Sequence, residues 1–175
     1  MIVVSDATPL IHLSKIDELH LIKRLYEKCY ITQTVYNETV VEGQKFGHHD
    51  SDLIKDAIGH WLEIKDPKGD VDQLIQKYSI HFGEASSILL AKESSTLLLI
   101  NERDGREVAR KEGVLVKGTL GIIADGVKEK KINATSAIAM LETFENEPNE
   151  FWLDPIIVHE AIKVISEIGK NKQKS

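Results

Sequence analysis

The sequence is poor in several features that would indicate particular classes of protein. Its 175 residues include one cysteine, Cys29, so no disulfide can form within the chain, which suits a reducing cytosol. Lysine and arginine number 22 against 28 aspartates and glutamates, a formal charge of −6 that argues against nucleic-acid binding by bulk attraction. No apolar run approaches the ~20 residues of a membrane span, and residues 1–6 do not form a basic signal region. We therefore expect a cytoplasmic protein with no membrane partner.

The composition is that of an ordinary globular protein. Hydrophobic residues make up 42% and charged residues 29%, which excludes a disordered or collagen-like chain. The length fits one domain, and neither an internal repeat nor a long linker divides the chain. We expect a single domain over residues 1–169 and a frayed basic tail over residues 170–175.

Short apolar runs alternate with longer amphipathic stretches. The runs predict five strands, at residues 2–4, 30–32, 61–64, 96–100 and 114–116. Between them, apolar residues recur about three or four positions apart, which is the helical period. Continuous apolar strands joined through helices predict an α/β fold, in which a parallel sheet is covered on both faces.

Polar side chains at the expected strand ends and helix starts are the candidate functional residues. Asp6 follows the first strand and Asn101 the fourth, while Glu38 and Glu84 stand in the first turns of helices. In a parallel α/β sheet, functional groups gather beyond the carboxyl ends of the strands. Carboxylates that converge there repel one another, and a hard divalent cation such as Mg²⁺ or Mn²⁺ relieves the repulsion. Such an ion activates water and neutralises charge on a phosphate.

Each acid also has an ordinary structural interpretation. Glu84 in a first helical turn complements the helix dipole, Asp6 caps the segment that follows it, and Glu38 is a solvated helix residue. For the acids that follow Asn101, pairing with neighbouring arginines is the simpler explanation. Only the joint placement of the acids favours a functional site.

Four segments of the sequence resemble motifs of the PIN-domain proteins, in particular the branch of the VapC toxins of toxin–antitoxin pairs. These segments are VSDATPLI at residues 4–11, VYNE at 35–38, GEASSILLA at 83–91 and LLINERDGREVA at 98–109. Residues 116–121 and 151–153 also fit this branch. The resemblance extends over nearly the whole chain, and four motifs in the same order make it fairly specific.

The resemblance implies a PIN-like three-layer α/β/α fold with a five-stranded parallel sheet. It implies an endoribonuclease that hydrolyses RNA phosphodiesters, with Asp6, Glu38 and Glu84 as catalytic residues and with Mg²⁺ or Mn²⁺ held by these acids and Asn101. For the toxin branch it also implies a homodimer and a small antitoxin protein as partners. This branch usually carries aspartate where the chain has Asn101, an amide that can ligate a cation without bringing charge.

Further candidates surround this set. Thr8, Glu102 and Asp104 are supporting candidates, although neighbouring residues of a strand point to opposite sides. A basic stretch near the fourth strand is a candidate for holding the RNA backbone, although such a run is more often a solvated helix face. Its members are Arg103, Arg106, Arg110, Lys111 and Lys117.

Two other functions stay open. Asn101 favours a catalytically degenerate PIN domain that acts as an RNA- or protein-binding module, and metal titration separates this from an enzyme. A small-molecule phosphohydrolase would use similar metal chemistry in a closed, narrow crevice. Cys29 is expected to be a small buried hydrophobe, and His12 an ordinary surface or half-buried residue. The apolar stripe at residues 137–141 could supply a dimer face, although core packing is its commoner role.

Overall fold

The computed structural model describes the backbone of residues 1–173 and the side chains of residues 1–169. Contacts between Cα atoms divide the chain into two units, Met1–Thr119 and Leu120–Ser175. The single domain expected over residues 1–169 therefore stays a prediction. The last helix continues to Gln173, and residues 174–175 of the expected frayed tail lie outside the described residues.

Five parallel strands form one sheet in the first unit, in the order β3-β2-β1-β4-β5. They are β1 (Ile2–Ser5), β2 (Lys28–Ile31), β3 (Leu62–Ile64), β4 (Leu97–Leu99) and β5 (Val116–Lys117). All five predicted strands are confirmed, with ends that differ from the prediction by at most two residues. The second strand ends before Thr32 because the Thr32 hydroxyl accepts a hydrogen bond from the Val35 N–H (3.3 Å) and caps the next helix.

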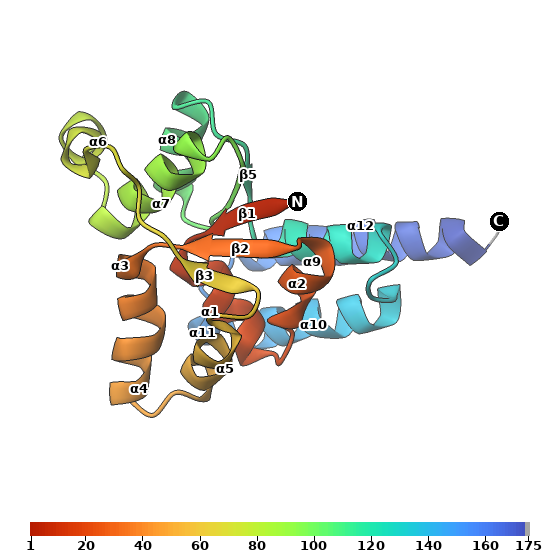
Figure 1. Cartoon of the computed structure of the whole chain (residues 1–175). Helices are drawn as coiled ribbons and strands as arrows, with labels where there is room; N and C mark the ends of the chain where they lie inside the picture. Colours follow the sequence, from red (N-terminus) through yellow and green to blue (C-terminus); the bar gives the residue numbers. More distant parts are fainter. Residues whose placement is uncertain (174–175) are drawn as a thin grey trace. The chain divides into compact units, whose positions relative to one another are not determined.

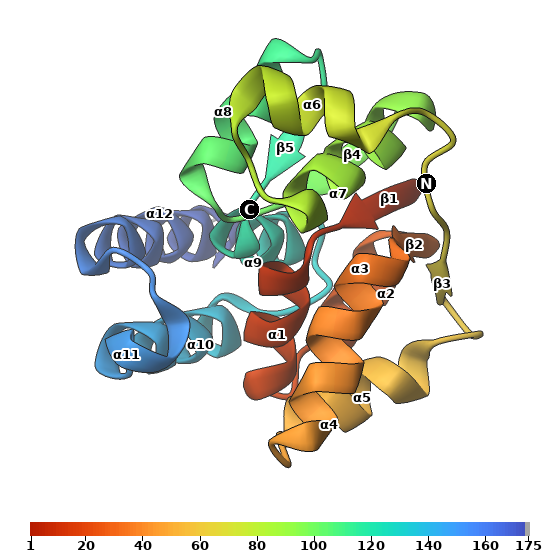
Figure 2. The same ribbon diagram turned by 90° about the vertical axis from the view of Figure 1, so that its left-hand side faces the viewer.

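Helices cover both faces of the sheet in the first unit (Figure 1, Figure 2). On one face lie α6 (Val71–Tyr78), α7 (Phe82–Glu93) and α8 (Arg103–Lys111). The opposite face is covered by α1 (Ala7–Lys15), α2 (His20–Leu25), α3 (Gln33–Tyr36), the π-helical turn η1 (Asn37–Glu42), α4 (Gly43–Lys45) and α5 (His49–Ala57). This is the expected three-layer α/β/α architecture with a five-stranded parallel sheet.

The central strands are apolar throughout because helices cover both of their faces. Val3 and Val4 of β1 are fully buried although they point to opposite faces, and the same holds for Leu98 and Leu99 of β4. Cys29 in β2 is also buried, and burial raises the pKa of its thiol. The expectation that Cys29 is a small core residue is confirmed.

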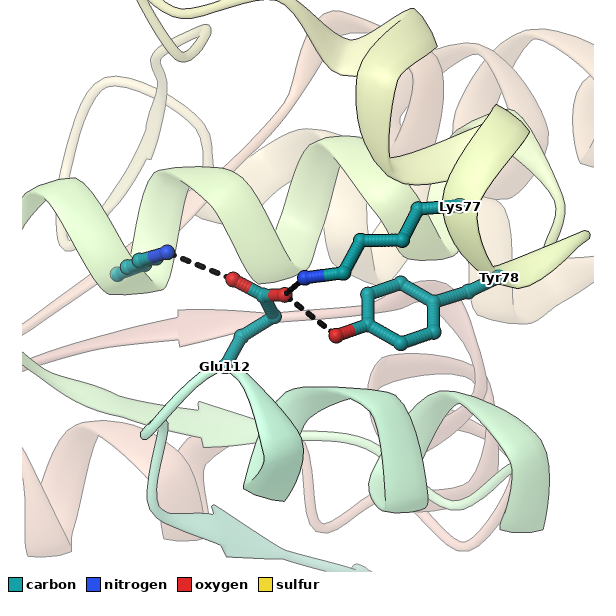
Figure 3. A network of polar contacts seen from close by, with 4 residues as sticks. Lys77, Tyr78 and Glu112 are labelled. Carbon is teal, nitrogen blue, oxygen red and sulfur yellow. Dashed lines mark hydrogen bonds and ion pairs between the residues drawn. The ribbon is translucent and has the colours of Figure 1, made fainter.

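A network around Glu112 connects α6, α7 and the end of α8 (Figure 3). One carboxylate oxygen of Glu112 accepts hydrogen bonds from Lys77 Nζ (2.9 Å) and Tyr78 OH (2.6 Å). The other accepts from Lys92 Nζ (2.6 Å), and the side chain of Glu112 is only 9% exposed. The bonds from Lys77, Lys92 and Tyr78 lower the pKa of Glu112 to about 2. The three helices on this face of the sheet are thus held by charge as well as by apolar packing.

The second unit begins at the second residue of α9 (Thr119–Lys128) and contains α10 (Ala134–Asn146), α11 (Pro148–Phe151) and α12 (Pro155–Gln173). Helix α10 packs against α12, and the rings of Phe144 and Phe151 lie 4.5 Å apart between their centroids. In the stripe considered as a dimer face, Ala137, Met140 and Leu141 are buried, so these residues belong to a core. Within the described residues, no helix is both long and apolar enough to cross a bilayer.

Candidate active site

A cavity of about 570 Å³ lies beyond the carboxyl ends of β1 and β4. These neighbouring strands are where the strand order reverses, since the chain runs from β1 outward to β3 and then returns to β4 on the other side. A ligand site is expected at such a position. The lining residues are Asp6, Ala7, Thr8, Glu38, Ser79, Ile80, His81, Gly83, Glu84, Glu102, Arg103 and Asp104.

Asp6 lies at the base of the cavity, directly after β1. Its N–H donates to the Leu99 carbonyl (2.9 Å), which continues the pairing of β1 with β4, and its side chain accepts a hydrogen bond from Ser87 Oγ (3.2 Å). The residue is only 5% exposed. Burial, with the nearby charges of Glu38 and Glu84, raises the pKa of Asp6 to about 7, although hydrogen bonds from Ala7 and Ser87 oppose the shift. The site therefore holds a carboxylate whose ionisation it disfavours.

Glu38 stands at the second position of the π-helical turn η1, which continues α3 without a break. Such turns are frequent at functional sites because they redirect side chains within a helix. The Glu38 carboxylate lies over the backbone of Gly83, where a Cβ atom would come within 2.9 Å of Oε1. Burial and then the charge of Glu84 raise the pKa of Glu38, while His81 lowers it. Glu38 lines the cavity and is partly accessible to solvent there.

Glu84 caps a helix and also lines the cavity, while its expected role as a metal ligand stays a prediction. It lies in the first turn of α7, and its Oε2 accepts a hydrogen bond from the His81 N–H (3.2 Å), which completes a capping box at the start of that helix. The other carboxylate oxygen, Oε1, lies beside Gly105: a Cβ atom added to this glycine would be 2.9 Å from it. Glu84 therefore lines the cavity while one of its carboxylate oxygens caps the start of α7.

Two buried serines of α7, whose roles the sequence did not indicate, join the start of this helix to the residues that follow β1 and β2. Ser87 donates to Asp6, as noted, and Ser86 Oγ lies 3.2 Å from Thr32 Oγ1 at the end of β2. Ser86 also donates to the Gly83 carbonyl (2.9 Å). The start of α7 is thereby fixed against the ends of both β1 and β2. The only local signal was two adjacent hydroxyls in an otherwise apolar helix, and their partners are far away in the sequence.

Asn101 does not line the cavity, although it was expected to be the fourth metal ligand. Its Oδ1 accepts a hydrogen bond from the Thr119 N–H (2.8 Å), and its Nδ2 lies 3.1 Å from His12 Nδ1. His12 is 3% exposed rather than a surface residue, and burial lowers its pKa to about 4. The chain turns after β4, so that Asn101 faces inward while the next residue, Glu102, faces the cavity. The expected role of Asn101 as a metal ligand stays a prediction.

The supporting candidates Thr8, Glu102 and Asp104 all line the cavity, and Thr8 Oγ1 donates to Glu102 Oε1 (3.3 Å). Among the basic candidates, Arg103 alone lines it, with a side chain that is 89% exposed and 3.4 Å from Glu107. Burial, and then the charge of Arg110, lowers the pKa of Arg106. Outside the cavity lining are Arg106, Arg110, Lys111 and Lys117.

The acids of the cavity fit a hard divalent cation in donor type and charge. Across the described residues, no lysine or arginine forms an ion pair with Asp6, Glu38 or Glu84, and their mutual repulsion is the kind that a cation removes. The same part of the chain contains no group of three His, Cys, Asp or Glu side chains arranged to hold one ion. One oxygen of the Glu84 carboxylate already accepts the His81 N–H (3.2 Å).

The chain is similar to a known protein family and to a solved structure. Residues 2–167 match the family DUF3368, described as PIN domain. The crystal structure of PAE2754 from Pyrobaculum aerophilum is similar to this chain, with a TM-score of 0.47 and 18% identity, over 66% of this chain and 92% of that one. No curated protein matches the chain. Because the family match extends over almost the whole sequence, the chain belongs to the PIN-domain family, whose members are generally divalent-metal-dependent nucleases.

Proposed function

We propose that this protein is an endoribonuclease that hydrolyses RNA phosphodiesters with Mg²⁺ or Mn²⁺. The observation that carries the proposal is the convergence of Asp6, Glu38 and Glu84 on one cavity, where within the described residues none of them forms an ion pair with a lysine or arginine. Asp6 is buried, and the charges of Glu38 and Glu84 add to the cost of ionising it, so a cation in the cavity would relieve an unfavourable arrangement. Membership of a family of nucleases supports the same conclusion.

The roles of the residues follow from their positions. Asp6, Glu38, Glu84 and Glu102 would hold the ion, in part through water, since Mg²⁺ usually keeps several waters when it binds to protein. When bound, the ion supplies an activated water and neutralises charge on the scissile phosphate. Thr8 orients Glu102 through its hydrogen bond, and Arg103 at the rim is placed to contact a neighbouring phosphate.

The second candidate, a catalytically degenerate PIN domain that binds RNA or protein, is favoured by one observation. Within the described residues, no three His, Cys, Asp or Glu side chains are arranged to hold one ion. A site that no longer binds a metal would have the same property. The sequence also favoured a degenerate domain because Asn101 carries no charge. That argument loses force because Asn101 is not among the residues that line the cavity. A degenerate domain would bind RNA equally well with and without Mn²⁺ and leave it intact.

RNA cleavage by the purified full chain tests the proposal. We expect a mixed-sequence RNA to be cut in Mn²⁺ and not in EDTA, and Asp6→Asn to lower the rate by at least about 100-fold. Asp56→Asn is the matched control, since it makes the same change of charge at an exposed position of α5. Equal cleavage by wild type and Asp6→Asn would exclude this cavity as the source of activity.

The toxin role, the relationship to the VapC branch, the homodimer, the antitoxin and the cytoplasmic location stay predictions from the resemblance and the composition. One feature supports a protein partner: Trp152, Ile156, Ile157 and Val164 are apolar and more than half exposed. Growth arrest on expression, relieved by the product of an adjacent reading frame, would identify a toxin. Chromatography with light scattering would give the oligomeric state.

A further inference from the structure

Asn101 joins three segments that are distant in the sequence. Its Oδ1 accepts hydrogen bonds from the backbone N–H (2.8 Å) and hydroxyl (3.2 Å) of Thr119, which follows β5. Its Nδ2 lies 3.1 Å from His12 Nδ1 in α1 and 3.0 Å from Thr119 Oγ1. We call these three residues the Asn101 clamp. Both ends of the amide have partners within the protein.

The hydrogen bonds fix which way the amide faces and which form His12 takes. A backbone N–H can only donate, so the atom of Asn101 that faces Thr119 N must be the oxygen, and the nitrogen must face His12. An amide nitrogen only donates, so His12 Nδ1 must accept and its proton must reside on Nε2. The clamp therefore requires a neutral His12, in agreement with its burial.

Close packing around the clamp leaves little freedom for the chain at this point. A Cβ atom at Gly118 would lie 3.0 Å from Asn101 Oδ1 and 3.3 Å from an Arg106 guanidinium nitrogen. The Ile100 N–H donates to the Lys117 carbonyl (2.8 Å), so the backbone is held immediately before Asn101 as well. The residue immediately after Asn101 is Glu102, which caps α8 and lines the cavity.

We propose that Asn101 is a positioning residue: by holding the turn between β4 and α8 against α1 and Thr119, it directs Glu102 into the cavity, and no carboxylate is needed at position 101. This inference rests on the proposed metal-dependent function. Asn101 then acts through its neighbour, and the charge that it lacks has no bearing on metal affinity. The opposite view, that Asn101 is an impaired ligand, makes a different prediction for the same substitutions.

The decisive variant is Asn101→Asp in the full chain, titrated with Mn²⁺ by calorimetry. A positioning role predicts a Kd within about 3-fold of wild type, because the new carboxylate still accepts from Thr119 and faces away from the cavity. A ligand role predicts binding tighter by about 10-fold or more, since a charged ligand replaces a neutral one. In the metal-free protein, ¹⁵N NMR should show the His12 proton move from Nε2 in wild type to Nδ1 in Asn101→Asp, because a carboxylate can only accept.

A double-mutant cycle separates positioning from a general loss of stability. Asn101→Ala should weaken Mn²⁺ binding by about 10-fold in wild type and have no further effect in Glu102→Gln, because both changes act on the same ligand. An additional loss in the Glu102→Gln background would contradict the proposal. If Asn101→Ala does not fold, Thr119→Val is used in its place. We then expect a smaller loss of Mn²⁺ affinity in the wild-type background and no further loss in Glu102→Gln.

The outcomes also separate this inference from the proposed function. Wild-type protein that binds no Mn²⁺ would contradict the proposed function and the positioning role together. Tighter binding by Asn101→Asp, in a protein that does bind Mn²⁺, would overturn the positioning role alone. A His12 proton on Nδ1 in wild type would contradict the clamp itself, whatever the metal does.

Discussion

The Glu38 carboxylate lies directly over Gly83, so that a Cβ atom at this glycine would be 2.9 Å from Glu38 Oε1. A glycine at the start of α7 therefore provides the space in which an acid from η1 approaches Glu84. The absence of a side chain at position 83 is part of the site, because contacts below about 3 Å force the neighbouring atom to move.

Gly83→Ala should displace the Glu38 carboxylate and weaken Mn²⁺ binding by about 10-fold or more. The fold should be retained, since the displaced atoms are the end of a flexible side chain and alanine favours a helix over glycine. Calorimetric titration with Mn²⁺ measures the affinity, and thermal unfolding checks the fold.

Gly69→Ala is the matched control for Gly83→Ala. A Cβ there would also approach a glutamate, at 3.1 Å from Glu93 Oε1, but neither residue lines the acidic cavity. Mn²⁺ affinity should be unchanged in this variant. If both substitutions weaken binding equally, the contact between Glu38 and Gly83 is not the cause.

Asp6→Asn should raise the stability of the metal-free protein at pH 8. The folded-state pKa of Asp6 is raised to about 7 from an ordinary value of 3.8, so the folded protein binds a proton that the unfolded chain releases. Stability is therefore lost as pH rises from about 4 to about 7, and the neutral amide avoids this loss. Unfolding in EDTA should show a higher Tm for Asp6→Asn at pH 8 and little difference at pH 4. A lower Tm at pH 8 would contradict the assigned burial and repulsion.

Mn²⁺ affinity should increase with pH up to about pH 7 and level off above it. Ligating carboxylates must be ionised, and Asp6 releases its proton near pH 7. One proton released on binding corresponds to about a tenfold change in Kd per pH unit below that value. Titrations at pH 5.5, 6.5 and 8 measure the slope, and a Kd independent of pH would mean that Asp6 is not a ligand.

Glu112→Gln should lower the free energy of unfolding by about 1–2 kcal/mol at pH 7 without changing RNA cleavage. The bonds from Lys77, Lys92 and Tyr78 hold the pKa of Glu112 down at about 2, so its contribution is complete above about pH 4.5 and is lost as pH falls toward 2. Urea unfolding at pH 7 and pH 3 measures both effects. Glu107→Gln, which removes only an exposed pair with Arg103, should have a much smaller effect.

The fold was largely predictable because its signals are local. The apolar runs that became β1 and β4 are short and continuous, as strands buried on both faces must be, and helical patterns separate them. The approach of Asp6, Glu38 and Glu84 to one cavity followed from the rule for the carboxyl ends of parallel strands, together with the resemblance.

The orientation of Asn101 was not predictable, for the same reason that made β4 easy to find. A strand that is apolar on both faces has no alternation from which to read which way the next residue points. The partners of the buried polar side chains were equally hidden. Ser87 bonds to Asp6 across 81 positions, and Asn101 to His12 across 89, so no pattern within a local window contains either pair.

The most direct test of the account is a calorimetric titration of the metal-free full chain with Mn²⁺ at pH 8. Wild-type protein should show saturable binding that weakens at least about 10-fold in Glu38→Gln and in Glu84→Gln, while Asp56→Asn binds as wild type does. Glutamine can still accept the capping bond at position 84, so a loss there would report the missing charge. Equal binding by wild type, Glu38→Gln and Glu84→Gln would contradict the claim that these acids together hold a divalent cation.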